Sequence, residues 1–445
     1  MSTFYRVGTA NMYDSTLRNL GARQSNLVGL QENLTSGKRV VRASDDPVAA
    51  AQAERALTRI SRIQSEQRAL EVQRNAVAQA ESTMGDAIGL VQEMRQLIIA
   101  AGGGTLKPED RKTYTNQIQS LREQLTEVIN RKDTNGIPLL GALGSALEPF
   151  VGPLTSDPDY AFAGQPGQNA GTNVSLPTTM DGHSAFMFNP QRDGVYNATI
   201  SNPNAATPLS GRQFTTTAVS VQNPGQIQPN PTPPNDPYTY SVSFTNVTTN
   251  ADGTFNATYQ VTSNNPNFVP PAAVTRSNLS TAKANEFPVQ ITDPGGATLS
   301  FSITAQAAKD TSGAFTLSPA TGDTVTLQAS PSILSSLDSA IRNIGDAPNN
   351  NAATQAVGQA LAAVDAGMER MQAMRGYAGE QLNRADRIMG DQENRSIQLE
   401  ADRSRAVDLD MVKGISDFQN SQVGYQAALQ SYAMVQKLSL FNFIS

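Results

Sequence analysis

The 445-residue chain contains no cysteine and no tryptophan, and it has a single histidine, His183. Without cysteine it forms no disulfide, and Cys/His zinc sites and thiolate chemistry are excluded by composition alone. Acidic residues outnumber basic ones by 39 to 33, which gives a formal net charge of -6. This balance lacks the basic footprint that nucleic acids or an anionic membrane surface require, so we expect neither as a partner.

Long apolar runs are also missing. No stretch reaches the roughly 18 apolar residues of a membrane-spanning helix. The N-terminus, MSTFYRVGTANMYDSTLRNL, lacks the basic start and the following apolar run of a secretory signal peptide. We therefore expect that, if the protein leaves the cell, it is exported without a cleaved signal.

Groups for catalysis or metal binding are equally scarce. His183, in DGHSAF, has no second histidine with which to share a metal or build a nucleophile relay. The glycines of AAGGGTLKPED lack the spacing and the Lys-Ser/Thr pair of a phosphate-binding loop, and they indicate a turn between two helices. We expect no enzyme activity, no cofactor and no metal.

Composition sets residues 151–330 apart as a β-rich outer domain. This segment holds 19 of the 25 prolines and few charged residues, and strand-like stretches alternate with turn signals. TYSVSFTNVTT and FNATYQVTS flank Asp252-Gly253 and predict a hairpin. ATLSFSITAQ and DTVTLQA alternate in the same way and predict further strands.

The flanking segments 46–150 and 331–404 predict a helical shaft. Apolar residues recur at 4,3 spacing from Ile60 to Ile98 without an intervening proline, a second helix begins at Pro108, and a third seam runs from Val357 to Met389. Three such stripes are buried only against one another. The expected fold class is α+β: an elongated, coiled-coil-like bundle of N- and C-terminal helices with an inserted outer β-rich domain.

Both ends of the chain, 1–45 and 405–445, carry a further 4,3 stripe. A lone helix of this length is marginal in water, so each stripe needs a partner. Two alternatives stay open: an intramolecular antiparallel pair, or ends that are disordered in the monomer and pair only in an assembly. Glutamines within the stripes favour a specified register, since a buried amide must find a partner. The candidate assembly seam consists of Leu17, Leu20, Gln24, Leu27, Gln31, Leu34, Ile415, Phe418, Gln422, Tyr425, Leu429 and Tyr432.

A candidate inter-domain joint lies between the first stripe and the long helix. Ser36-Gly37 ends the first helix, because glycine suits a left-handed terminating residue. Asp46 is a good N-cap and Pro47 a good first helical residue, so the long helix begins there. The residues of the joint are Gly37, Lys38, Arg39, Arg42, Asp45, Asp46 and Pro47.

Two stretches resemble the bacterial flagellin family: LQENLTSGKRVVRASDDPVAAAQAERAL, which starts at Leu30, and the tail QNSQVGYQAALQSYAMVQKLSLFNFIS. The resemblance covers residues 1–140 and 350–445 and leaves out the β insert. Within the family, Asp45-Asp46-Pro47 and the ending LSLFNFI resemble the hook-associated subunits that join hook to filament. DTNGIPLLGALGS is closer to filament subunits, so a flagellin-type filament subunit stays open as an alternative.

The resemblance implies an extracellular structural subunit of the flagellum that is exported unfolded through the flagellum's own channel. The implied partners are hook-associated proteins, flagellin, further copies in a homo-oligomeric ring, and an export chaperone on the C-terminal helix. It also implies that Lys38, Arg39 and Arg42 meet carboxylates on an adjacent subunit or on the C-terminal spacer ADRSRAVDLDM. A hypothesis of another class is that the uncharged, Thr/Asn-rich insert is an adhesin-like binding module.

Overall fold

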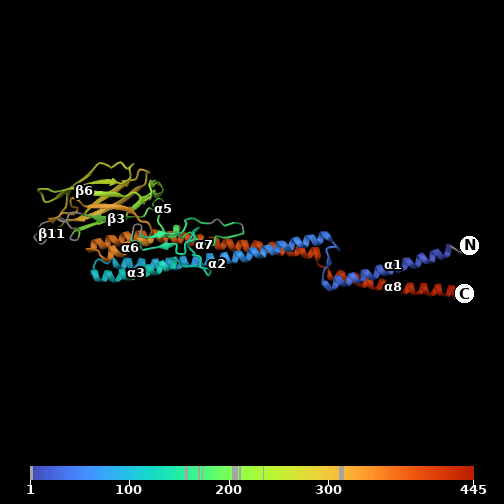
Figure 1. Ribbon diagram of the computed structural model, residues 1–445. Helices are drawn as coiled ribbons and strands as arrows, with labels where there is room; N and C mark the ends of the chain where they lie inside the picture. The colour runs from blue at the N-terminus through green and yellow to red at the C-terminus, as the bar shows by residue number, and fades with distance from the viewer. Residues whose placement is uncertain are drawn as a thin grey trace. The chain divides into compact units, whose positions relative to one another are not determined.

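The computed structural model describes residues 4–444 apart from 156–158, 169–170, 173, 203–208, 210–211, 234 and 310–314, so residues 1–3 and 445 of the terminal segments lie outside it. The predicted α+β class is confirmed: long helices come from both flanks and a β sandwich is inserted between them (Figure 1). The helices are α1 (Phe4–Ser36), α2 (Pro47–Ala101), α3 (Pro108–Ile129), α4 (Gly182–Phe186), α5 (Pro190–Asp193), η2 (Pro224–Gln226), α6 (Ile333–Gly345), α7 (Asn350–Val407) and α8 (Met411–Ile444).

The chain forms two compact units. The terminal unit comprises Met1–Leu70 and Asp386–Ser445, and the central unit comprises Glu71–Ala385. Helices α2 and α7 contribute residues to both.

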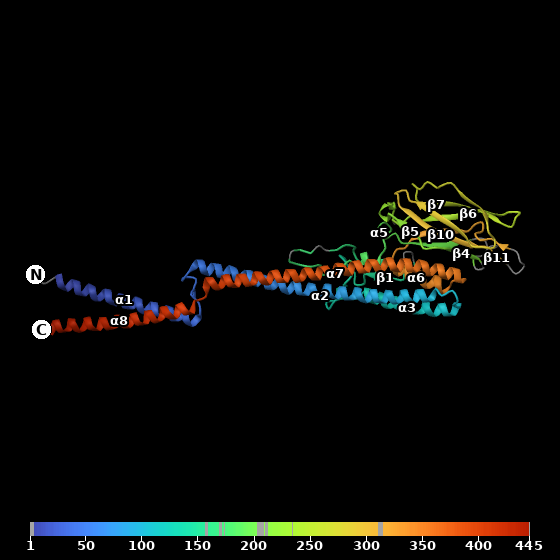
Figure 2. The ribbon, with the colours of Figure 1, turned by 180° about the vertical axis from the view of Figure 1, so that it is seen from behind.

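In the terminal unit, α1 and α8 lie side by side in both ribbon views (Figures 1 and 2). The Tyr432 hydroxyl donates a hydrogen bond of 2.7 Å to the Tyr13 hydroxyl across this pair. The start of α2 and the end of α7 belong to the same unit, and here the Gln392 amide donates to the Glu66 carboxylate at 3.4 Å.

The apolar seam predicted for α2 is confirmed. Each of its apolar members is at most 9% exposed: Ile60, Ile63, Leu70, Val77, Met84, Ile88, Val91 and Ile98. Charged residues lie beside this apolar seam and form ion pairs between α2 and α7. Arg375 pairs with Glu81 and Arg95 pairs with Asp365, both at 2.7 Å. These pairs join α2 to α7, so helices from opposite ends of the sequence form one bundle.

Helices α3 and α6 complete the core of the central unit. The start of α3 at Pro108 is confirmed, with Glu109 and Asp110 in its first turn. The sequence had not resolved α6 as a separate helix. Ser332 caps it by accepting a hydrogen bond from the Ser335 amide, and its apolar face, which includes Leu337, is buried against the other helices.

The segment between α3 and the sandwich packs on the helices. Strand β1 (Phe150–Val151) pairs with β2 (Ala161–Phe162), and the Phe150, Tyr160 and Phe186 side chains belong to the helical core. The sandwich therefore begins well beyond residue 151, at Tyr196.

Two antiparallel sheets form the sandwich. One has the strand order β3-β13-β6-β7-β8; in the other, β10 pairs with β9 on one side and with β4 and β5 on the other. The hairpin predicted at Asp252-Gly253 joins β6 to β7, and the two other predicted strands are β10 and β13. The strands are β3 (Tyr196–Ser201), β4 (Gln213–Thr216), β5 (Ser220–Gln222), β6 (Tyr240–Thr249), β7 (Phe255–Ser263), β8 (Val274–Leu279), β9 (Asn285–Thr292), β10 (Thr298–Gln306), β11 (Ala308–Lys309), β12 (Phe315–Thr316) and β13 (Thr324–Ala329).

Amide side chains attach the sandwich to the helices. The Gln359 amide at α7 donates to the Ala198 carbonyl of β3 at 2.9 Å, and the Asn349 amide donates to the Arg212 carbonyl at 3.1 Å. Arg212 itself is fixed by two hydrogen bonds, 2.6 and 2.7 Å long, to the buried Asp323 carboxylate. The insert is thereby held on the α6–α7 side of the bundle by polar contacts that a buried ion pair keeps in place.

Gly367 and Gly376, both in α7, should respond to alanine with opposite signs. A Cβ at Gly367 would lie 2.3 Å from the Ile333 Cδ1 atom of α6, whereas nothing lies within 4 Å of a Cβ at Gly376. Gly367→Ala should destabilise the central unit by about 1–3 kcal/mol through overpacking. Gly376→Ala should stabilise it by about 0.5–1 kcal/mol through helix propensity. Urea unfolding of both variants checks this, and two shifts of equal sign would contradict the α6–α7 packing.

Candidate functional site: the joint and the terminal helix pair

The joint begins where α1 ends. Gly37 has a φ of +68°, so the left-handed termination predicted for it is confirmed. The chain then runs antiparallel to the segment that links α7 to α8. The Arg39 amide donates to the Val407 carbonyl at 2.7 Å, and the Leu409 amide donates to the Gly37 carbonyl at 2.9 Å. The two interhelical connections are therefore tied together by their backbones.

Two aspartates shape the restart of the helix. One Asp45 carboxylate oxygen accepts hydrogen bonds from the Val41 and Arg42 amides at 3.1 and 2.8 Å, which closes the turn. One Asp46 oxygen accepts from the Val48 and Ala49 amides at 3.2 and 3.0 Å. The predicted N-cap is thus confirmed, and Pro47 is the first residue of α2, where its missing N–H costs nothing.

Asp46 is held in its charged form. The hydrogen bond from the Ala49 amide is the main reason why the pKa of this carboxyl lies below its usual value of 3.8, and the Arg39 guanidinium lowers the pKa further. Arg39 donates to Asp46 at 3.3 Å and to the Ala406 carbonyl at 2.8 Å. One guanidinium therefore links the N-cap of α2 to the last turn of α7.

The three basic residues of the joint have different surroundings. Of these three described residues, Arg39 is the one whose side chain contacts the C-terminal spacer, by donating to the Ala406 carbonyl. Arg42 pairs with Glu32 of α1 at 2.9 Å. The Lys38 backbone forms an isolated antiparallel β-bridge with the Asp408 backbone. The Lys38 side chain is exposed and makes no ion pair among the described residues. Contacts of these residues with an adjacent subunit stay a prediction.

The terminal helices touch through only half of the predicted seam. On α1, Leu20 is buried, and Leu27 and Leu34 are half-buried, each seven residues apart. On α8, Phe418, Tyr425 and Tyr432 are half-buried with the same spacing. The remaining members are exposed: Leu17, Gln24, Gln31, Ile415, Gln422 and Leu429. Within one chain the glutamines are not buried, so they do not set the register of this pair.

Small residues explain the difference. The other contact positions of α8 are Gly414, Ser421 and Ala428, which the search for large apolar residues passed over. A Cβ at Gly414 would lie 3.3 Å from the Leu34 side chain, so the two helices approach closely there. The face of α8 that meets α1 is rotated toward its small residues, and its larger apolar residues are left on other faces.

Those larger residues are exposed over a broad face of α8 outside its contact positions, and we call them the stripe of α8. Val412 is 82% exposed, Val423 66%, Met434 64%, Ile415 46% and Leu429 42%. On α1, Leu17 remains 43% exposed. Surface this apolar on a helix that already has one partner is typical of a protein–protein contact. Pairing α1 with α8 therefore leaves these apolar side chains in contact with water.

Other kinds of site have no counterpart in the described part of the chain. Among these residues no helix is both long and apolar enough to cross a membrane. The same residues include no group of three or more His, Asp or Glu side chains placed to hold a metal ion. His183 is half-buried beside Phe162, and burial is the main cause that lowers the pKa of its imidazole. The exposed stripe and the joint remain the candidate site.

Comparison with known proteins confirms the resemblance to the bacterial flagellin family. Residues 7–143 match the family model described as the bacterial flagellin N-terminal helical region. Flagellar hook-associated protein 3 of Escherichia coli K12 is 26% identical over 201 residues, which are 44% of this chain and 58% of that protein. The Salmonella typhimurium protein of the same name is 31% identical over 149 residues, which are 33% of this chain and 46% of that protein. The match thus spans about half the length of these relatives.

The fold is shared more widely than the sequence. The crystal structure of flagellar hook-associated protein 3 from Legionella pneumophila superposes with a TM-score of 0.55 at 20% identity, and the match covers 78% of this chain and 97% of that one. The two proteins therefore share a fold over the matched part of this chain.

Acid should release the cap of α2. Because the pKa of Asp46 is lowered from 3.8, its contribution to stability is complete above that pH and is lost as the pH falls through the lowered pKa. Hydrogen exchange of the first turn of α2, corrected for intrinsic rates, should accelerate in acid. In Asp46→Asn, whose amide caps at every pH, the exchange should not respond to acid, and in Asp46→Ala it should be fast throughout. The same acid response in Asp46→Asn would assign the effect to another group.

Proposed function

We propose that this chain, whose residues 7–143 match the flagellin N-terminal helical region, is a structural subunit of the bacterial flagellum that joins the hook to the filament. The observation that carries the proposal is the apolar stripe of α8, which remains exposed although α8 already lies against α1. The similarity to proteins named flagellar hook-associated protein 3 supports the hook–filament junction as the place of assembly.

The mechanism is burial of the stripes between subunits. Leu17 on α1 and Ile415 and Leu429 on α8 lose their contact with water when copies or related subunits pack around them. Fully burying one such side chain contributes about 1.5–3 kcal/mol, so a few residues per helix suffice for a specific contact. In this proposal the terminal segments order fully only on assembly, as in coupled folding and binding.

The proposed partners follow from the same surface. Copies of this chain form a ring, hook-associated subunits lie on one side of it, and flagellin or further hook-associated subunits lie on the other. Before assembly an export chaperone covers the C-terminal helix, since an exposed apolar stripe is prone to aggregate. The chain reaches the outside through the flagellum's own export channel without a cleaved signal. It acts by assembly and not as an enzyme.

A flagellin-type filament subunit is the second candidate, and the family model of the flagellin N-terminal helical region favours it. The hypothesis that the sandwich is an adhesin-like binding module stays a prediction, tested by whether the full chain binds glycans through that domain.

A charge at Leu429 should block assembly and leave the monomer intact. Leu429 is 42% exposed and lies on the stripe of α8, outside its contact with α1. Leu429→Glu should reduce incorporation into flagella about a hundredfold or more, because burying an unpaired carboxylate costs several kcal/mol. The exposed Ser431, on the flank of α8 opposite to Leu429, gives the matched control, Ser431→Glu, which adds the same charge away from the stripe. Equal incorporation of both variants, measured by quantitative immunoblotting of sheared flagella, would refute the role of the stripe.

Self-assembly separates the two flagellar candidates. The purified chain, concentrated and seeded with short fragments of its own assemblies, should stop at rings or remain monomeric if it joins hook to filament. Long filaments in electron micrographs would instead identify a filament subunit. The Ser431→Glu variant, treated in parallel, should behave as the unmodified chain.

A further inference from the structure

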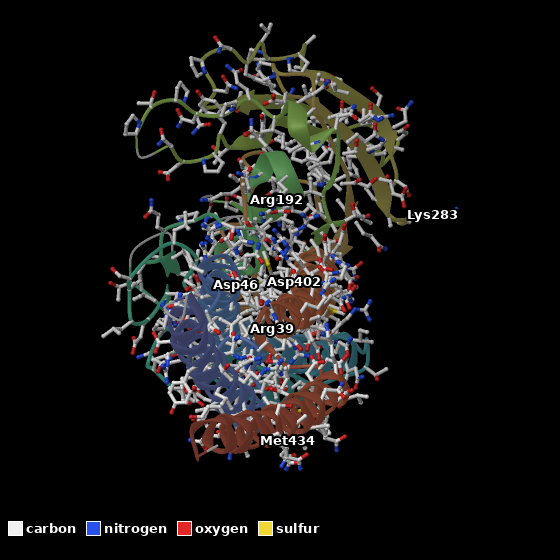
Figure 3. The ribbon with its side chains drawn as sticks, turned by 90° about the vertical axis from the view of Figure 1, so that its right-hand side faces the viewer. Arg39, Asp46, Arg192, Lys283, Asp402 and Met434 are labelled. Atoms are coloured by element: carbon white, nitrogen blue, oxygen red, sulfur yellow. The ribbon has the colours of Figure 1, made fainter. Side chains whose placement is uncertain are left out.

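Four arginines line one groove of the terminal unit. They are Arg39, from the joint; Arg55 and Arg59, from the first turns of α2; and Arg405, from the end of α7. The groove also contains two carboxylates, Asp46 and Asp402 (Figure 3). In a chain whose formal net charge is -6, this groove has an excess of positive charge.

Both carboxylates of the groove are already engaged. Asp46 accepts from Arg39 and caps α2, and Asp402 pairs with Arg405 one turn away in α7. Arg55 and Arg59 make no ion pair among the described residues, and both are exposed. They stand four residues apart on one face of α2, where two like charges repel each other and destabilise a helix. An anion that enters the groove removes this repulsion.

A carboxylate beside the joint offers the matching charge. In a closed ring every copy is related to the next by rotation about one axis, so the joints of all copies lie at the same height along that axis. Asp408 lies beside the joint. Its backbone bridges Lys38, whereas its carboxylate is exposed and makes no ion pair among the described residues. Asp45 and Asp410, by contrast, accept hydrogen bonds from backbone amides.

We propose that the groove lined by Arg55 and Arg59 binds the Asp408 carboxylate of a neighbouring copy of this chain. The inference rests on the proposed function, because it takes the ring as the setting of the contact. A guanidinium pair on one copy and a carboxylate on the next form a head-to-tail contact, which closes a ring and fixes its direction. The apolar stripes supply adhesion, and this charge contact selects the angular position of each subunit.

Charge exchange tests the proposal. Arg55→Glu/Arg59→Glu should raise the protein concentration needed for assembly at least about tenfold, and Asp408→Lys should raise it as well. The variant that carries all three changes places two glutamates opposite a lysine and should recover most of the loss. The matched control is Arg68→Glu/Arg395→Glu, which changes the net charge equally at exposed positions of the same unit outside the groove. It should assemble as the unmodified chain does. Circular dichroism verifies that each variant is folded.

A second measurement does not depend on ring formation. Because the chain has no cysteine, single cysteines report unambiguously. A copy with Gln52→Cys, at the groove, is mixed with a copy with Val412→Cys, beside Asp408, and treated with a short bis-maleimide. Cross-linked heterodimers should form, and Arg55→Glu/Arg59→Glu should reduce their yield about tenfold. A copy with Val269→Cys, exposed in the sandwich, should give none.

The outcomes are distinguishable. If the unmodified chain assembles but the groove variants assemble equally well, or the triple variant shows no recovery, the contact with Asp408 is wrong and the proposed function stands. If no cysteine pair cross-links although the unmodified chain is incorporated into flagella, the inference alone fails. If the unmodified chain is not incorporated into flagella, the proposed function fails and the inference fails with it.

Discussion

The mutual burial of α2 and α7 is the interaction on which the rest of the molecule depends. Residues separated by some three hundred positions share one core, as Val77 and Ala378 do. Neither stripe is stable in water alone, because a helix of this length exposes a continuous apolar surface. The chain must therefore leave the bundle and return. The segments between α2 and α7 are therefore insertions into the helical bundle, and the two terminal segments of the chain belong to the same unit.

Sequence patterns predicted the elements whose signals are local and repeated. The seam of α2, the start of α3 at Pro108 and the hairpin at Asp252-Gly253 depend on periodicity, caps and turn residues, which act over a few positions. Strand β9 was missed because Pro288 interrupts its pattern. Among the described strands it pairs with β10 alone, and an edge strand tolerates a proline because one side of its backbone has no partner strand.

The site was predicted in part for the same reason. The cap at Asp46 and the left-handed Gly37 follow from the residues themselves. The partner of Arg39, the carbonyl of Ala406, lies 367 positions away, and no local rule identifies it. The contact face of α8 was misplaced by about one position because the search weighed large apolar residues, whereas close approach selects small ones.

The small residues of α8 have a consequence for exchange. Gly414, Ser421 and Ala428 remove little apolar area from water, so the contact of α8 with α1 depends mainly on the half-buried Phe418, Tyr425 and Tyr432. In the proposed assembly, α8 exchanges its contact with α1 for a contact with another subunit. The larger apolar side chains of α8, which are already exposed, pack against that subunit. In the proposed assembly, the pair of α1 and α8 in the single chain is the state from which α8 moves into contact with neighbouring subunits.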